Sequence, residues 1–409
     1  MIELLAPAGN LIKLQTAFEY GADAVYLGGD MFSLRALSGE FEGDRLERAI
    51  DYAHSIGKKV YVTANIIPHN NDIPELEEYI TFVKEAGADA IIVADPGVVD
   101  LCLKCGVGGG ASGTQIHLST QANNINYASC NFWHGMGVKR VILGRELSLD
   151  EIREIRERVP DTLELEVFVH GAMCIGYSGR CLISNYVTSR DSNRGKCAQP
   201  CRWEYNVSAA NSTDSDEFDL DLTENERGTF IFNSKDLCLI NYIKELAEAG
   251  VSSFKIEGRM KSEYYLATVV KAYRGEIDRY LQEGAKYNPS SGARAELEKV
   301  SHRVYSEGFI NGRQNDMQIY GTSSYIRSCD FVGVVEGCDG GFIKATQRGK
   351  FLRGDTLEIL QPRGENVVIN NCEIYDEDGA EIDATPHPMM TFKVKYDGAV
   401  EKGSFIRKI

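Results

Sequence analysis

Four cysteines lie close together in a stretch that has neither a helical nor a strand period. Cys174, Cys181, Cys197 and Cys201 are separated by six, fifteen and three residues. Four thiolates are the ligand set of an iron–sulfur cluster, and a loop can wrap such a core with irregular spacing. Structural zinc sites prefer ligands two to four residues apart, which only the last pair satisfies. The spacing predicts a 4Fe-4S cluster, with zinc or unrelated buried thiols as alternatives and Cys238 as a substitute ligand.

The same stretch, residues 170–203, is rich in basic residues although the whole chain carries a formal net charge of −16. Such a charge argues against a protein that coats nucleic acid non-specifically, because phosphate neutralisation needs clustered Lys and Arg. A local cluster is nevertheless typical of an anion or phosphate platform. The platform residues are Arg180, Arg190, Arg194, Lys196 and Arg202. The alternative is a solvated loop that merely carries arginines.

Further polar residues follow the strands that the sequence predicts. Arg145 and Arg259 occur in the parallel phrases "LGRE" and "EGR", and two guanidinium groups facing one site suit a small molecule with carboxylates. Asn65, Gln121, His170 and Glu257 complete the candidate catalytic set. The alternatives are that a lone barrel histidine is a hydrogen-bonded core residue and that Glu257 neutralises Arg259.

A loose internal repeat predicts the strands and helices that position these residues. Helical patterns end in glycine and are followed by short apolar strands, as in "EYGADAVYLGG" and "EAGADAIIVAD". Eight such strands begin near Ile2, Ala24, Lys59, Ala90, Gln115, Arg140, Leu163 and Ser253. Alternating strands and helices imply a parallel sheet, and eight units favour a closed (β/α)8 barrel, TIM-like, over an open doubly wound sheet. Catalytic groups of such barrels lie on the loops after the strands.

Two departures from the repeat define the domains. A long insert follows the seventh strand and holds the cysteine stretch, then the polar segment 206–228, which reads as an exposed hairpin or loop. From about residue 321 onward, short apolar runs alternate with Gly, Pro, Asp and Asn, which predicts a small all-β barrel. We therefore expect a catalytic barrel over 1–320, with the iron–sulfur loop at 170–203, and a C-terminal β-barrel domain over 321–409.

Composition excludes several classes of protein. The chain has 409 residues, of which 43% are hydrophobic and 25% charged, as in ordinary globular proteins. No basic flank with a long apolar run opens the chain, and no apolar stretch is long enough to span a membrane, so we expect a cytoplasmic protein in which disulfides rarely persist. The motifs of zinc peptidases, serine hydrolases and Walker A nucleotide triphosphatases are absent from the sequence.

Several phrases together resemble the collagenase-like peptidase family U32. The stretch "EVFVHGAMCIGYSGRCLIS", residues 166–184, fits the family signature at its constrained positions. "ELLAPAGN", "GADAVYLGG", "NRGKCAQPCRWEY" and "NSKDL" with "KIEGRMKS" are also similar to the family. The resemblance covers essentially the whole chain, including the C-terminal β domain.

This resemblance implies an activity at odds with the family's name. Similar members are understood as oxygen-independent hydroxylases with a four-iron cluster, here on Cys174, Cys181, Cys197 and Cys201. The branch of this length resembles enzymes that form 5-hydroxyuridine at the first anticodon position of tRNA. Prephenate, a dicarboxylate, is the implied source of the hydroxyl oxygen, and a paralogous partner subunit is possible. The alternatives are a collagenase-like peptidase, for which Ser178 and Ser184 have no recognisable base, and a non-catalytic RNA-binding iron–sulfur protein.

Overall fold

The computed structural model describes residues 2–29, 32–33, 41, 43–108, 113–174, 176–177, 179–203, 233–312, 319 and 324–409. The polar segment expected at 206–228 and the domain boundary expected between 320 and 321 lie outside these described residues. Ser178, one of the two serines considered as peptidase nucleophiles, also lies outside them.

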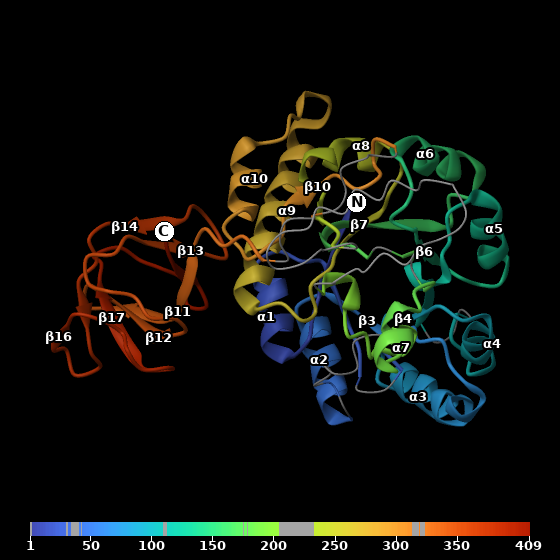
Figure 1. The fold of residues 1–409 in the computed structure, drawn as a ribbon, viewed down its shortest axis with the longest axis horizontal. Coiled ribbons are helices and arrows are strands. Elements are labelled where there is room, and N and C mark those ends of the chain that lie inside the picture. The colour runs from blue at the N-terminus through green and yellow to red at the C-terminus, as the bar shows by residue number, and fades with distance from the viewer. Residues whose placement is uncertain are drawn as a thin grey trace, which may run out of the picture.

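The larger domain is the predicted closed barrel of eight parallel strands surrounded by helices (Figure 1). Closure comes from the last strand, which pairs in parallel with both the first and the seventh. The strands are β1 (Glu3–Pro7), β2 (Ala24–Leu27), β3 (Lys59–Ala64), β4 (Ala90–Val93), β5 (Gln115–Leu118), β6 (Arg140–Ile142), β7 (Glu164–Ala172) and β9 (Ser253–Ile256).

Helices between the strands form because their apolar residues recur on one face and because polar residues cap their ends. The α6 helix shows this locally, since Ser148 and Glu151 form a reciprocal capping box at its start. After α1 the chain turns at Gly21, whose φ of 111° disfavours other residues. The helices are α1 (Leu11–Glu19), α2 (Asp44–Ser55), α3 (Ile73–Glu85), α4 (Pro96–Lys104), α5 (Tyr127–Gly135), α6 (Leu149–Arg158), α7 (Ile183–Thr188), α8 (Ile243–Glu248), α9 (Glu263–Glu283) and α10 (Ser291–Leu297).

Two short strands that the sequence does not predict extend the sheet, one in the insert after β7 and one after α10. Strand β8 (Asp236–Cys238) pairs antiparallel with the end of β7, and β10 (Tyr305–Ser306) pairs in parallel with β8. Short 3₁₀ turns complete the described loops: η2 (Asn70–Asp72), η3 (Thr120–Ala122), η4 (Ser192–Arg194), η5 (Pro200–Arg202), η6 (Ile240–Tyr242) and η7 (Gly284–Lys286). The added strands widen the sheet beside the seventh strand without opening the barrel.

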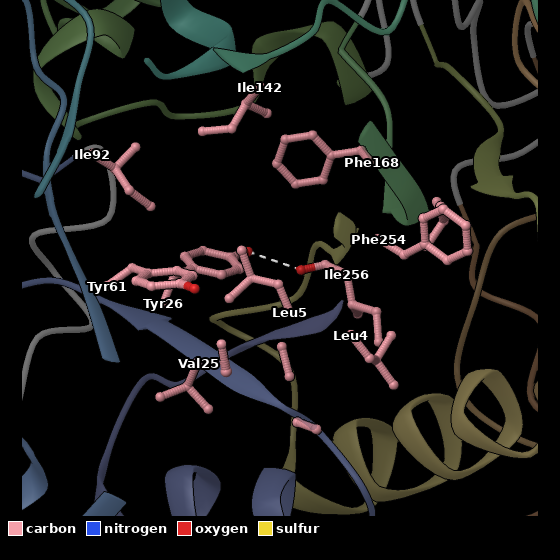
Figure 2. Packing of buried hydrophobic residues seen from close by; sticks show 14 of the residues in the cluster. Leu4, Leu5, Val25, Tyr26, Tyr61, Ile92, Ile142, Phe168, Phe254 and Ile256 are labelled. Atoms are coloured by element: carbon pink, nitrogen blue, oxygen red, sulfur yellow. Dashed lines mark hydrogen bonds between the residues drawn. The ribbon is translucent and has the colours of Figure 1, made fainter. Parts of the chain in front are cut away.

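The barrel interior is filled by layers of side chains from alternate strands, as expected for this fold. Figure 2 shows Tyr26, Ile92, Ile142 and Phe168 projecting from different strands into the interior, where Tyr26 donates a hydrogen bond to the carbonyl of Ile256. Tyr26 is 6% exposed and Phe168 is 8% exposed. This apolar layer forms a floor beneath the open end of the barrel.

A buried ion network lies among these layers. Arg140 Nη1 donates to Glu3 at 2.5 Å and to Glu166 at 3.1 Å, and Lys255 Nζ donates to Glu166 at 2.7 Å. Glu166 is fully buried, so both of its cationic partners offset the cost of removing the carboxylate from water. The network fixes Lys255 in one position within the barrel.

The C-terminal domain is all-β, as predicted, and its described residues form one antiparallel sheet. The sheet order runs from β14 through β13, β18, β11, β12, β17 and β15 to β16, and the two edge strands are not paired with each other, so it is a half-barrel. The strands are β11 (Asp330–Asp339), β12 (Phe342–Gln347), β13 (Leu357–Leu360), β14 (Val367–Ile369), β15 (Ile374–Tyr375), β16 (Glu381–Ile382), β17 (Thr391–Lys395) and β18 (Phe405–Lys408).

The half-barrel packs on the side of the barrel formed by α1, α9 and α10 (Figure 1). Tyr264 of α9 stacks on Phe331 of β11 with ring centroids 5.2 Å apart. Arg407 of β18 is fully buried and pairs with Glu296 at 2.7 Å and with Glu358 at 2.9 Å. Aromatic packing and a buried ion cluster therefore join the two domains.

Candidate active site

A cavity of about 190 Å³ opens at the end of the barrel where the strands finish. Its floor includes the apolar layer of Tyr26, Ile92, Ile142 and Phe168. Its walls come from the strand-end loops and from the cysteine loop that follows β7. The predicted residues that line it are Asn65, Gln121, Arg145, Glu257, Arg259, Cys174, Cys181, Cys197 and Cys201. Groups from five loops far apart in sequence therefore meet at one place.

All four predicted cysteines line this cavity. Cys174 is exposed, while Cys181, Cys197 and Cys201 are half-buried. Burial raises the pKa of the Cys201 thiol, and the nearby Cys174 and Cys197 thiols raise it further, whereas Arg202 lowers it. The backbone N–H of Gln199 donates to Cys197 Sγ at 3.4 Å, which is the kind of contact that stabilises a thiolate ligand.

The four cysteines share one cavity without forming a ready-made site for a single metal ion. No three His, Cys, Asp or Glu side chains among the described residues stand close enough to hold a single metal ion. A zinc ion needs four sulfurs about 2.3 Å from its centre, whereas the sulfurs of a four-iron cluster lie around a larger core. Four thiols lining one cavity are a donor set that fits a four-iron cluster, and zinc also binds four thiolates, so the choice between the two stays a prediction.

The cysteine loop is seated on the barrel by close backbone contacts. Gly179, with a φ of 74°, packs against the carbonyl oxygen of Gln121, and a side chain there would overlap that oxygen. Ser184 is fully buried; its Oγ donates to Arg190 O at 2.7 Å and accepts from Ala198 N at 2.9 Å. Because its hydroxyl holds the loop together, Ser184 is unsuited to act as a peptidase nucleophile.

Arg194, which the sequence assigns to the phosphate platform, instead ties the loop to the barrel. Its two terminal nitrogens donate to the Asp72 carboxylate at 2.5 and 2.8 Å. The hydrogen bond from Arg194 lowers the pKa of the Asp72 carboxyl to about 2. The same contact region includes a hydrogen bond from Ile67 N to Asn193 O at 3.1 Å. The guanidinium of Arg194 is thus engaged by a carboxylate, and its role in the phosphate platform stays a prediction.

An Arg194→Ala variant should loosen this attachment. Because the Arg194–Asp72 pair is partly exposed, we expect the free energy of local opening to fall by about 1 kcal/mol. Hydrogen exchange at the Ile67 amide should then be roughly fivefold faster at neutral pH. Because the pKa of Asp72 is depressed, its contribution is present above about pH 4 and is lost as the pH falls toward 2. The difference in Ile67 exchange rate between wild type and variant should therefore shrink as the pH falls from about 4 to 2. Lys104→Ala, which removes an exposed pair with Asp100, is the control, and a pH-independent difference would contradict the account.

Two cations meet at the aromatic ring of Phe168 in the cavity floor. The Arg145 guanidinium lies 3.9 Å from the ring centroid and Lys255 Nζ lies 5.4 Å from it. Arg145 Nη1 donates to Ala172 O at 2.5 Å, while its buried Nε has no hydrogen-bond partner among the described residues. Burial lowers the pKa of Lys255, and Glu166 opposes that effect. The floor therefore presents fixed positive charge to the cavity.

Arg259 is a third cation among the lining residues. It is 4% exposed, and its Nη1 donates to Ser33 Oγ at 2.6 Å. Glu146 and Glu257 are the carboxylates among the lining residues. Lys255 is already paired with Glu166 at 2.7 Å. Arg145 and Arg259 are therefore the lining cations that an anionic ligand would contact. Lys255 and Glu146 were not among the predicted catalytic residues, although both occupy strand-end positions that the repeat identifies.

His170 is not among the residues that line the cavity, and its catalytic role stays a prediction. Strand alternation from Glu166 through Phe168 places His170 inward, but the pairing with β9 shifts register between Phe168 and His170. The ring packs instead against Tyr273 and Tyr305, with centroids 5.6 and 5.3 Å away. Burial lowers the pKa of His170 to about 3. It is a neutral core residue.

Cys238, the proposed substitute ligand, lies in the same core. It is 2% exposed in β8, and its sulfur accepts from Tyr273 Oη at 4.0 Å. It does not line the cavity. The structure therefore gives no support for exchanging Cys238 with one of the four clustered cysteines.

The remaining platform residues lie on the outer side of the cysteine loop. Arg180, Arg190 and Lys196 are exposed, and Arg202 is half-buried with Nη1 donating to Tyr325 Oη at 3.4 Å. Exposed apolar side chains are interspersed with them, including Tyr186, which is 92% exposed, and Trp203, which is 41% exposed. Basic groups with aromatic rings beside them are typical of surfaces that contact single-stranded nucleic acid.

Comparison with known families covers both domains. Residues 9–319 match the model of peptidase family U32, and residues 327–407 match the model of the peptidase family U32 C-terminal domain. The chain belongs to peptidase family U32. The four cysteines and the cations of the cavity all lie within the part of this U32 chain that the first model matches.

Individual relatives of this U32 chain carry names that refer to RNA. Bacillus subtilis (strain 168) tRNA hydroxylation protein P1 is 40% identical over 409 residues, covering 99% of this chain and 94% of the relative. Escherichia coli (strain K12) tRNA hydroxylation protein P is 41% identical, covering 91% and 89%. The 23S rRNA 5-hydroxycytidine C2501 synthase of Escherichia coli (strain K12) is 33% identical, covering 80% of this chain and 48% of the relative.

No helix in the described part of the chain is both long and apolar enough to cross a lipid bilayer.

Proposed function

We propose that this U32 chain is an iron–sulfur enzyme that hydroxylates the wobble uridine of tRNA to 5-hydroxyuridine without molecular oxygen. The observation that carries the proposal is the single cavity that joins four cysteines to three cations. The relatives named as tRNA hydroxylation proteins cover almost the whole chain, which supports RNA as the substrate class. The proposed cellular site is the cytoplasm, and the RNA partner is the anticodon stem-loop.

Cys174, Cys181, Cys197 and Cys201 would hold the cluster. When bound there, a four-iron cluster supplies one-electron redox chemistry or a Lewis-acidic iron beside the substrate. The chain's own residues bind and orient the reactants around it. The half-buried position of three of the four cysteines limits access of water to that side of the cavity.

The cations of the floor suit a carboxylate-bearing co-substrate, for which we propose prephenate. Arg145 is held by Ala172 and Phe168, so its remaining donors are already oriented before a ligand arrives. Replacing the C5 hydrogen of uridine by hydroxyl removes two electrons from the base. The co-substrate supplies the oxygen atom and, as the oxidant, takes up those electrons.

The target base must leave the anticodon stack, because a ring carbon inside a stack is not accessible to side chains. Asn65 and Gln121 line the cavity with amide groups that can both donate and accept, which matches the alternating groups on the edge of uracil. The exposed basic and aromatic residues of the cysteine loop would hold the neighbouring phosphates and bases. A paralogous subunit could share this surface.

The nucleosides of cellular tRNA test this proposal. Cells lacking this chain should lose 5-hydroxyuridine and its derivatives, and expression of the wild-type chain should restore them. An unchanged nucleoside profile would contradict the hydroxylase function and favour the alternative of a non-catalytic RNA-binding protein. Gelatin cleavage that persists in a Cys174→Ala variant would instead favour the peptidase alternative.

A further inference from the structure

A second hollow of about 550 Å³ lies between the barrel and the C-terminal half-barrel. It is lined by the β9–α9 loop, by the end of the cysteine loop, and by residues 325–331, which lead into β11. We call this the interdomain groove. Glu257 lines both the groove and the cysteine cavity, so the two hollows adjoin.

The chain carries its cavity residues and groove residues on the same short loops. Cys201 lines the cavity, and Arg202, the next residue, lines the groove. Arg259 lines the cavity, and Lys261, two residues later, lines the groove. A ligand that fills the cavity with one part can therefore extend into the groove with the next.

The groove is locally basic on an acidic protein. Among the described residues, Arg202, Lys261 and Arg327 line it against the one carboxylate of Glu257, while the whole chain has a net charge of −16. Arg327 pairs with Asp330 at 3.2 Å, but both side chains are well exposed and Asp330 does not line the groove. Exposed pairs of this kind are weak enough to exchange for a phosphate.

Tyr325 organises these cations around an aromatic ring. Its hydroxyl accepts from Arg202 Nη1 at 3.4 Å, and Lys261 Nζ lies 4.3 Å from its ring centroid. Tyr325 is 45% exposed, and Met260, on the same groove, is 61% exposed. Apolar and aromatic surface between basic groups suits the bases and phosphates of an unpaired strand.

We infer that the interdomain groove binds the RNA strand that continues from the nucleotide in the cavity, so that the C-terminal domain is part of the RNA-binding surface. This inference rests on the proposed function, since it takes the substrate to be RNA. Phosphates would contact Arg202, Lys261 and Arg327, and a base would lie over Met260 and Tyr325. The groove thereby distinguishes a polymeric substrate from a free nucleoside.

Binding of a fluorescent anticodon stem-loop RNA, measured by anisotropy over a series of salt concentrations, tests the inference. The double variant Lys261→Ala with Arg327→Ala should weaken binding by about tenfold and reduce the slope of log affinity against log salt by roughly 1 to 2. The matched control is Arg353→Ala with Lys395→Ala, which removes two exposed cations from the half-barrel that pair with Glu381 and Glu373. The control should bind RNA like wild type.

Met260→Glu provides a second variant that removes no contact needed for folding. A carboxylate at this exposed position should also weaken RNA binding, with unchanged thermal stability and unchanged iron content. If wild-type protein binds and modifies RNA and both groove variants bind RNA like the control, the inferred role of the groove is wrong and the proposed function stands. Wild-type protein that neither binds nor modifies RNA would overturn the proposed function and this inference with it.

Discussion

A Cys201→Ala variant is expected to lose tRNA hydroxylation by on the order of 10³-fold or more, together with the visible absorbance of the cluster. Cys201 is the half-buried thiol whose pKa is influenced by both Cys174 and Cys197, so it lies among the other ligands. Because four ligands act as one unit, the double variant Cys174→Ala with Cys201→Ala should be no less active than the single one. Nucleoside analysis of tRNA from complemented cells measures the activity.

Cys338→Ala is the matched control for this result. Cys338 is also half-buried, but it lies in β11 and its sulfur donates to Gly398 O, outside the cavity. The control should keep both absorbance and activity. Two results would contradict a cluster bound by all four cysteines. One is activity losses of the Cys174→Ala and Cys201→Ala variants that add in the double variant, and the other is full activity of the Cys201→Ala protein.

Arg145→Ala is expected to raise the KM for the carboxylate co-substrate, with kcat/KM lowered on the order of 10²- to 10³-fold. The guanidinium is fixed by Ala172 O and by the Phe168 ring, and an ammonium cannot reproduce its planar fork. Arg145→Lys should therefore recover only part of the loss. Steady-state kinetics with varied co-substrate at saturating RNA provides the measurement.

Arg153→Ala is the control for this second prediction. Arg153 lies nearby in sequence on α6, but it is exposed and pairs with Asp150 at 3.0 Å. Its loss should leave kcat/KM unchanged. An Arg145→Ala enzyme with normal KM for the co-substrate but weakened RNA binding would assign Arg145 to the nucleic acid instead.

The barrel could be predicted from sequence because each of its units is local. The strands expected at Ala24, Lys59 and Ala90 begin at those residues, since a glycine turn and an apolar run mark each one. Strands β8 and β10 have three and two residues, which is too short for any period to show. The half-barrel differs from a closed barrel only in whether its two edge strands pair with each other. That pairing is a long-range contact, which a local sequence pattern does not predict.

The site could be predicted in its residue types but less well in their roles. The four cysteines, Arg145 and Arg259 reach the same cavity because strand ends converge at one end of a barrel. The contact of Arg194 with Asp72 could not be predicted because the two residues are 122 positions apart. The packing of His170 could not be predicted because a register shift after Phe168 reverses the strand alternation. Contacts between distant segments and irregular pairing are invisible in a single sequence.

Whether the four cysteines bind a cluster is decided by the iron and acid-labile sulfide content of wild-type protein purified without air. We expect about four iron and four sulfide per chain, both lost when Cys201 is replaced. One zinc per chain with no sulfide, or metal-free protein with all four thiols free to react, would contradict it.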